Sequence, residues 1–208
     1  MFMVCRIPNI PRLIRLFVTS LMLWSLTITS SYSTTPEKAT EVVEEVIHTV
    51  NYMLHNNFPK AKIYAGIEEM FINMADTQYI GQVALGRQWL EISEPRRHLF
   101  LKIFQRYLAE KYSIYFPRFI GAEYEVIRAR TTRNDRTFEI VTTMYLPNEP
   151  PFPVYWDLVS LDDEPRIRNI TVDDLNLLVL EKKVIGALLE QSGGNLEELM
   201  RKLKYRYQ

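Results

Sequence analysis

The segment that most constrains this chain is a long run of aromatic and aliphatic residues beginning after Ser93. Leucine, isoleucine, phenylalanine and tyrosine recur there every three or four residues, a spacing that places them on one face of an α-helix. Ser93 can accept a hydrogen bond from a free amide of the first turn, and Pro95 is well tolerated there. The sequence therefore predicts a long helix ending near Pro117, whose apolar face holds Leu99, Phe100, Ile103, Phe104, Tyr107, Leu108, Tyr112, Tyr115 and Phe116.

The first 33 residues are of a different kind. Arg6, Arg12 and Arg15 precede an apolar run from Leu16 to Leu26, and small residues follow, which is the layout of a secretory signal. The apolar run is shorter than the roughly 20 residues that a bilayer-spanning helix needs. We expect cleavage after Ser33, which leaves residues 34–208 as one exported domain.

Composition narrows the chemistry of that domain. The only cysteine, Cys5, lies in the expected signal, so the exported chain has no disulfide, thiolate nucleophile or cysteine-bound metal. A bacterial periplasm suits such a chain. Because the signal takes away three arginines and no acid, the 25 basic and 25 acidic side chains become 22 and 25. A net charge of about −3 indicates no nucleic-acid surface.

The order of the expected elements indicates an α+β fold. Besides the long helix, helices are expected at residues 35–54, 62–74, 77–85, 175–191 and 196–204. Segments rich in β-branched and aromatic residues predict strands at 123–130, 137–145, 152–161 and 166–172. Their connections, including a hairpin turn at residues 133–135, are too short for parallel crossovers, so we expect a curved antiparallel sheet of about four strands.

No motif for catalysis or metal binding is visible. His48 and His55 lie two turns apart on one predicted helix, too far apart to share a metal, and His98 stands alone. Adjacent acids such as Glu44-Glu45 point about 100° apart on a helix and make poor acid–base partners. The sequence contains no GxSxG, P-loop or GxGxxG pattern. We therefore expect no enzyme activity, no metal site and no cofactor. The three histidines are expected to be exposed to solvent or to cap helix ends.

The positive signal is apolar surface. Alternate residues of two predicted strands are bulky and apolar, and such a sheet face beneath the long aromatic helix would form either a packed core or a cleft for an apolar ligand. The spacing does not separate these two alternatives. The candidate lining residues are Ile103, Phe104, Tyr107 and Leu108 of the helix and Phe138, Ile140, Met144, Val154, Trp156 and Leu158 of the strands.

Several short patterns follow one another between residues 40 and 204. They are Leu85-Gly86-Arg87-x-Trp89, then Ser93-x-Pro95-Arg96-Arg97 with Phe100, Phe104, Leu108 and Tyr112, then Pro153-Val154-x-Trp156-x-Leu158 with Pro165 to Val172, and finally Leu188-Leu189 with Gly193-Gly194-Asn195-Leu196 and Leu199. Each pattern alone is weakly specific. In this order, behind a secretory signal, they resemble the MlaC-like periplasmic phospholipid carriers, once called toluene-tolerance proteins.

The resemblance implies that N-terminal helices, the sheet and C-terminal helices enclose an apolar cavity, as in MlaC-like and NTF2-like domains. It also implies a periplasmic carrier that holds the acyl chains of a phospholipid and moves it between outer and inner membranes. The implied partners are an MlaA-like outer-membrane lipoprotein complex and an MlaD-like MCE-domain subunit of an inner-membrane ABC transporter. Each buried CH₂ contributes about 0.8 kcal/mol, so acyl chains can bind without a charged motif.

Two other interpretations stay open. A periplasmic adaptor would have a packed core and bind another protein by its surface. A small-molecule enzyme of the NTF2-like kind would need a buried acid or histidine pair facing the cavity, and the spacing places none there. An apolar void of several hundred cubic ångströms between the long helix and the sheet would favour the carrier over the adaptor.

Overall fold

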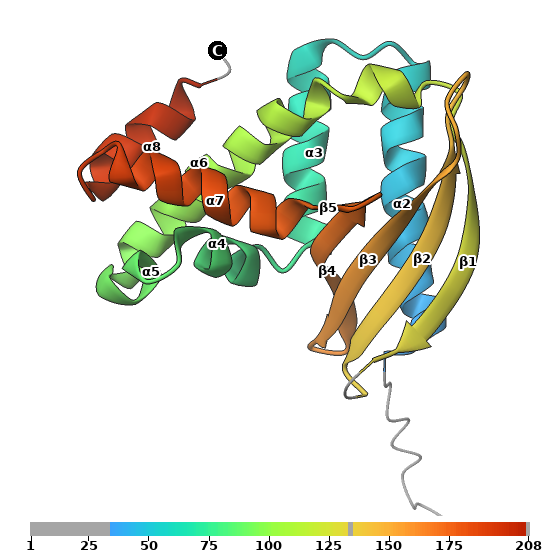
Figure 1. Cartoon of the computed structure of the whole chain (residues 1–208), viewed down its shortest axis with the longest axis horizontal. Coiled ribbons are helices and arrows are strands. Elements are labelled where there is room, and N and C mark those ends of the chain that lie inside the picture. The colour runs from blue at the N-terminus through green and yellow to red at the C-terminus, as the bar shows by residue number, and fades with distance from the viewer. Residues whose placement is uncertain (1–33, 133–134, 207–208) are drawn as a thin grey trace, which may run out of the picture. The chain divides into compact units, whose positions relative to one another are not determined.

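The computed structural model describes residues 34–132 and 135–206. The expected signal with its cleavage site, and Arg133 and Asn134 of the expected hairpin turn, lie outside these residues. Within them the order is helices, strands, helices, which confirms the predicted α+β class (Figure 1). The helices are α2 (Pro36–His55), α3 (Lys60–Met74), α4 (Thr77–Leu85), α5 (Gln88–Glu91), α6 (Glu94–Ser113), the 3₁₀ helix η1 (Phe116–Phe119), α7 (Leu177–Glu190) and α8 (Leu196–Lys204).

The five strands form one antiparallel sheet in the order β1-β2-β3-β4-β5. The strands are β1 (Glu123–Thr131), β2 (Thr137–Tyr145), β3 (Phe152–Leu161), β4 (Glu164–Val172) and β5 (Leu175–Asn176). The four predicted strands are confirmed, two of them with the predicted bounds. β4 begins two residues early because Asp162 and Asp163 both adopt positive φ, so two residues suffice to turn the chain from β3.

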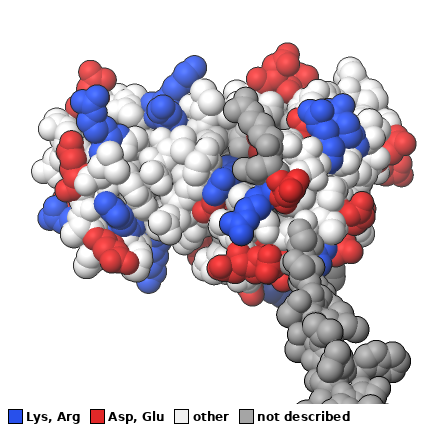
Figure 2. All heavy atoms as spheres, turned by 90° about the horizontal axis from the view of Figure 1, so that it is seen from below, with Lys and Arg blue, Asp and Glu red and all other residues white. Residues whose placement is uncertain are grey.

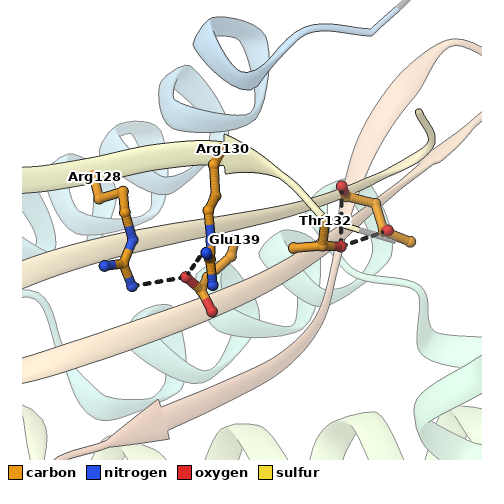
Figure 3. Close-up of polar contacts among 5 residues, drawn as sticks. Arg128, Arg130, Thr132 and Glu139 are labelled. Atoms are coloured by element: carbon orange, nitrogen blue, oxygen red, sulfur yellow. Dashed lines mark hydrogen bonds and ion pairs between the residues drawn. The ribbon is translucent and has the colours of Figure 1, made fainter. Parts of the chain in front are cut away.

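Strand β1 is an outer strand that does not present a flat edge. A bulge between Val126 and Arg128 leaves Ile127 out of the ladder. On the face of the sheet away from the core, Arg128 and Arg130 both donate to Oε1 of Glu139, at 2.9 and 3.0 Å (Figure 3). Burial alone would raise the pKa of Glu139, but the two arginines lower it below its usual value. A bulge and charged side chains are typical protections against edge-to-edge pairing.

The helix predictions hold in most places. The short turn with a tryptophan is α5, and the long helix is α6, which ends at Ser113 and is followed by η1 before the first strand. Ser93 precedes α6 but makes no side-chain cap hydrogen bond, so that detail was wrong. Asn195 does cap α8, with Oδ1 accepting from the Glu198 amide at 3.1 Å. The reciprocal bond of a capping box is not made, because the Glu198 carboxylate pairs with Arg201.

The predicted apolar face of α6 is too wide. Phe100, Phe104, Tyr107 and Leu108 are buried, whereas 47 % of Leu99 is exposed and 48 % of Tyr115, beyond the end of the helix, is exposed. Residues selected at three- and four-residue steps spread around the helix axis. Over five turns they cover a wider part of the circumference of α6 than the neighbouring helices can bury.

Helix α2, and not α6, covers the sheet. Its residues lie against β1, β2 and β4, and Figure 1 shows it running along one face of the sheet. α6 packs instead against α3, α4 and α8. The expectation that the long aromatic helix lies over the sheet is therefore corrected. The apolar stripes of α4, α7 and α8 occupy the buried face of α6, and the stripe of α2 is left for the sheet.

A polar joint connects the sheet to the helical part. β4 carries a bulge at Arg168, whose Nε donates to Oδ2 of Asp76 at 2.8 Å and whose guanidinium lies 4.5 Å from the ring centre of Tyr79. The other Asp76 oxygen caps α4 by accepting from the Tyr79 amide, and the Asp76 amide donates to the Ile167 carbonyl. One aspartate thus caps α4 and holds it to the sheet.

We expect Arg168→Ala to lower the free energy of unfolding by about 2 kcal/mol, the usual worth of a hydrogen bond to a charged group, because Asp76 is buried and loses a charged partner. Urea denaturation followed by circular dichroism measures this loss. Arg201→Ala is the matched control, because it also removes one arginine–carboxylate pair, but at an exposed site where such pairs contribute less than about 1 kcal/mol. Equal losses in the two variants would contradict a structural role for the joint.

Candidate functional site

The structure brings the six predicted strand residues together. Phe138, Ile140 and Met144 of β2 and Val154, Trp156 and Leu158 of β3 are all buried on the face covered by α2. Antiparallel pairing places Ile140 opposite Trp156 and Phe138 opposite Leu158. With Ala39, Val43 and Ile47 of α2 and Ile167 of β4 they form one apolar group, called here the sheet cluster.

One buried polar side chain lies on the same face of β2. Thr142 is fully buried and its Oγ1 accepts a hydrogen bond from Nε1 of Trp156, at 3.0 Å. Because the indole N–H donates to it, neither group needs water. The buried face of β2 therefore presents hydrocarbon and sulfur together with a polar group that is already hydrogen-bonded.

The four predicted residues of α6 lie in a second apolar group, the helix cluster. Phe104, Tyr107 and Leu108 are buried there with side chains of α4, α5, α7 and α8, and Ile103 packs at its border. The rings of Phe100, Phe104 and Tyr107 stack in series, with centroids 5.3 and 6.0 Å apart. The structure thus brings each half of the predicted set together but does not bring the two halves into one cluster.

A third group lies where α2, α3 and α6 meet. This seam cluster consists of Met53, Ile67 and Ala109 with the partly buried Val50, Phe58, Ile63, Met70, Phe71 and Phe116. Phe71 also packs against the helix cluster, and the next aromatic of η1, Phe119, packs against the sheet cluster. The seam cluster therefore shares Phe71 with the helix cluster, and it shares the helices α2 and η1 with the sheet cluster. Met53 contacts α3 closely at Gly66, where an added Cβ would lie 2.7 Å from Sδ.

Two depressions of the described surface lie elsewhere. One, of about 330 Å³, is lined by residues of α2 and the start of β4, including Glu41, Glu45 and Glu164. The other, of about 420 Å³, lies among α4, α5 and α7. Both are open to solvent, and no predicted lining residue contributes to either.

Two buried acids were missed by the sequence analysis. Glu181 of α7 accepts hydrogen bonds at one oxygen from Lys111 Nζ and the Tyr112 hydroxyl, both at 2.5 Å. Burial and then the Glu181 charge raise the pKa of Tyr112, so its hydroxyl keeps its proton and donates. Glu110 pairs with Arg106, which also approaches Glu68 of α3. The sequence did carry one signal for these acids, which was their position. Glu110 and Glu181 each stand where the three- and four-residue repeat of a buried helix face predicts an apolar residue.

These acids do not form a catalytic pair at the sheet. Glu181 faces α6 from α7, and Glu110 is bonded on α6 itself, so neither belongs to the sheet cluster. The second oxygen of each carboxylate has no hydrogen-bond partner among the described residues. A buried carboxylate held by a lysine and a tyrosine is also typical of a structural polar contact between helices.

The histidines are exposed, as predicted. Nδ1 of His55 lies 3.0 Å from the Asn51 carbonyl in the last turn of α2, and Nε2 of His48 lies 3.4 Å from the Tyr124 hydroxyl. Across residues 34–132 and 135–206, no three acids or histidines are grouped so that they could hold a metal ion. None of the helices in those same segments has both the length and the hydropathy to cross a bilayer.

Comparison with known proteins agrees with the fold described above. A structure of the phospholipid-binding protein from Ralstonia solanacearum, in complex with a phospholipid, is similar with a TM-score of 0.70 and 16 % sequence identity. The likeness covers 84 % of this chain and 97 % of that one. No curated protein matches the chain. The sequence model of the MlaC protein family matches residues 40–205, and the chain therefore belongs to the MlaC family.

Proposed function

We propose that this protein is a periplasmic carrier that binds a phospholipid by its acyl chains and moves it between the outer and inner membranes. Membership of the MlaC family and the shared fold with a protein in complex with a phospholipid support the proposal. Residues 1–33 are proposed as the export signal. The proposed partners are an MlaA-like outer-membrane lipoprotein complex and an MlaD-like MCE subunit of an inner-membrane ABC transporter.

The observation that carries the proposal is the match to the MlaC family over residues 40–205, and the composition of the sheet cluster agrees with it. The side chains of this cluster are aliphatic, aromatic or methionine, and Thr142, a buried polar residue beside it on β2, already accepts a hydrogen bond from Trp156. Such a surface binds acyl chains through the hydrophobic effect, at about 0.8 kcal/mol for each buried CH₂. It offers no acid–base pair for chemistry, so the proposed role is binding and not catalysis.

The proposed acyl-chain site lies between the sheet and α2 and continues into the seam cluster. α2 contributes small or β-branched side chains there, such as Ala39 and Val43, and the flexible Met53 lies at its far end. Methionine adapts its shape to different apolar neighbours. The aromatic residues of η1 contact both clusters, Phe119 the sheet cluster and Phe116 the seam cluster. Outward movement of α2 and η1 would expose the six strand residues together.

The lining predicted on α6 is part of this proposal under one condition. Ile103, Phe104, Tyr107 and Leu108 border acyl chains only if the chains pass the seam cluster and reach the helix cluster. Phe71, which packs against both of those clusters, marks the path.

Two tryptophans make this testable, because Trp156 lies in the sheet cluster and Trp89 in the helix cluster. The exported protein carrying Trp89→Phe has Trp156 as its only tryptophan outside the expected signal, and Trp156→Phe leaves only Trp89. Phospholipids with brominated acyl chains quench a tryptophan only at contact. We expect strong quenching of Trp156 and weaker quenching of Trp89.

The control is the same titration with unbrominated phospholipid, which gives the change in emission caused by binding alone, so that quenching is the further loss seen with the brominated lipid. Quenching of both tryptophans would extend the site to α6, as the sequence predicted. If neither tryptophan is quenched and no phospholipid is found by mass spectrometry of protein purified from the periplasm, the carrier proposal fails. A packed adaptor would then be the better description.

A further inference from the structure

The depression of about 420 Å³ among α4, α5 and α7 is lined by apolar side chains, Gln82 and two cations, Arg87 and Lys182; we call it the basic groove. Its apolar wall includes Tyr79 and Val83 of α4 and Leu90 of α5. Leu90 is 72 % exposed, the highest value among the large hydrophobic residues described. Gly86, at φ +61°, ends α4 and turns the chain so that α5 lies beside the groove.

The charge at the groove is of one sign. Arg87 and Lys182 line it and no acidic residue does. Neither cation makes a hydrogen bond or ion pair with its side chain among the residues that the structure describes, whereas Arg106, Arg168 and Arg201 all do. Figure 2 views the molecule from below, and there uncharged surface fills much of the middle of the helical half, with both basic and acidic side chains around it.

The position of the groove argues against a lipid head group. Its lining comes from α4, α5 and α7, and none of it belongs to the sheet cluster or the seam cluster, where the acyl chains are proposed to lie. Its charge argues against a bilayer surface, because anionic membranes are recognised by clusters of roughly four to eight basic residues and only Arg87 and Lys182 line this groove. Its exposed leucine and tyrosine argue against a small inorganic anion.

We propose that the basic groove is a docking site for an acidic segment of a partner protein that inserts an apolar side chain between α4 and α5. Carboxylates flanking that side chain would pair with Arg87 and Lys182, which gives the segment its register. The inference deepens the proposed function and rests on it for its purpose, since a carrier must dock where it is loaded and unloaded. Its physical test does not depend on lipid binding.

The probe is a fluorescently labelled synthetic peptide that forms a helix with leucines on one face and glutamates beside them. It is added to the exported protein, residues 34–208. Fluorescence anisotropy measures its affinity, which we expect to fall as salt is raised. Arg87→Glu/Lys182→Glu is expected to weaken binding at least roughly tenfold, because two attractions become repulsions. Leu90→Ser is expected to weaken it as well, without loss of fold, because that side chain is exposed.

A matched control is available on α6 and on the part of α7 outside the groove lining. Lys102→Glu/Lys183→Glu makes the same change in net charge at exposed lysines that do not line the groove, and it should leave the affinity nearly unchanged. Equal weakening in both double variants, or no binding of the peptide up to roughly 1 mM, would overturn the inference. Binding of the wild type to vesicles of phosphatidylglycerol that is lost in Arg87→Glu/Lys182→Glu, while the affinity for the peptide is unchanged, would also overturn it, in favour of a membrane surface.

The two proposals can fail separately. Quenching of Trp156 by brominated phospholipid should persist in Arg87→Glu/Lys182→Glu, because the groove lies outside the sheet cluster. Loss of quenching in the wild type would count against the carrier function alone. Normal quenching together with unchanged peptide affinity in the charge-reversal variant would count against the groove alone.

Discussion

Replacing Phe104 with alanine is expected to lower the free energy of unfolding by about 3–5 kcal/mol, the usual cost of removing a buried aromatic ring. Only 1 % of Phe104 is exposed, and its ring lies between Phe100 and Tyr107 in the stacked series of α6. The neighbouring helices cannot close the cavity fully, because the side chains around it belong to four other helices. Urea denaturation followed by circular dichroism measures the loss.

Leu99→Ala is the control, since it shortens an apolar side chain of the same helix at a position that is 47 % exposed. Its cost should stay below about 1 kcal/mol, as for most surface substitutions. A loss in Phe104→Ala as small as that in Leu99→Ala would show that the helix cluster is loosely packed. In that case the α6 residues would become better candidates for lining an acyl-chain site.

A loss of similar size is expected when the buried ion pair between α6 and α7 is broken from one side. Lys111→Met leaves the Glu181 carboxylate, 3 % exposed, without its charged partner, and one oxygen of that carboxylate already has no hydrogen-bond partner among the described residues. Removing one member of a buried pair typically costs about 3–5 kcal/mol, because the remaining charge is uncompensated. The same unfolding measurement applies.

The double variant Lys111→Met/Glu181→Met separates charge from packing. Replacing both members by apolar side chains of similar size removes the uncompensated charge, so the double variant should recover most of the lost stability. The Tyr112 hydroxyl loses its acceptor in that variant, which limits the recovery. Strictly additive losses from the two single substitutions would contradict a direct interaction between Lys111 and Glu181.

The strands show how far local pattern reaches. β2 and β3 have the predicted bounds because alternating apolar residues continue from one turn signal to the next. The same alternation places Phe138 and Ile140 on the buried face. β5 was expected to be the start of a helix, and only pairing with β4 makes Leu175 and Asn176 a strand. A two-residue strand has too little pattern of its own to be recognised.

For the candidate site, too, local pattern predicted one part and tertiary packing decided the rest. Periodicity identified the buried residues of α6 and of the sheet, but it placed them in one site, whereas they lie in two clusters. A repeat along one element shows which side is buried and not what buries it. The same limit applies to Glu181, since its position on an apolar stripe became meaningful only when α7 packed against Lys111 and Tyr112.

Residue order alone was sufficient for the family, the α+β class and most element bounds, because turn residues and apolar repeats act over a few neighbours. Which helix covers the sheet, how the basic groove forms and where Arg168 meets Asp76 depended on the folded chain. The physical reason is competition for buried area. α2 and α6 each present a stripe that could cover the sheet, and only the simultaneous packing of α3, α4, α7 and α8 assigns one to the sheet and the other to the helices.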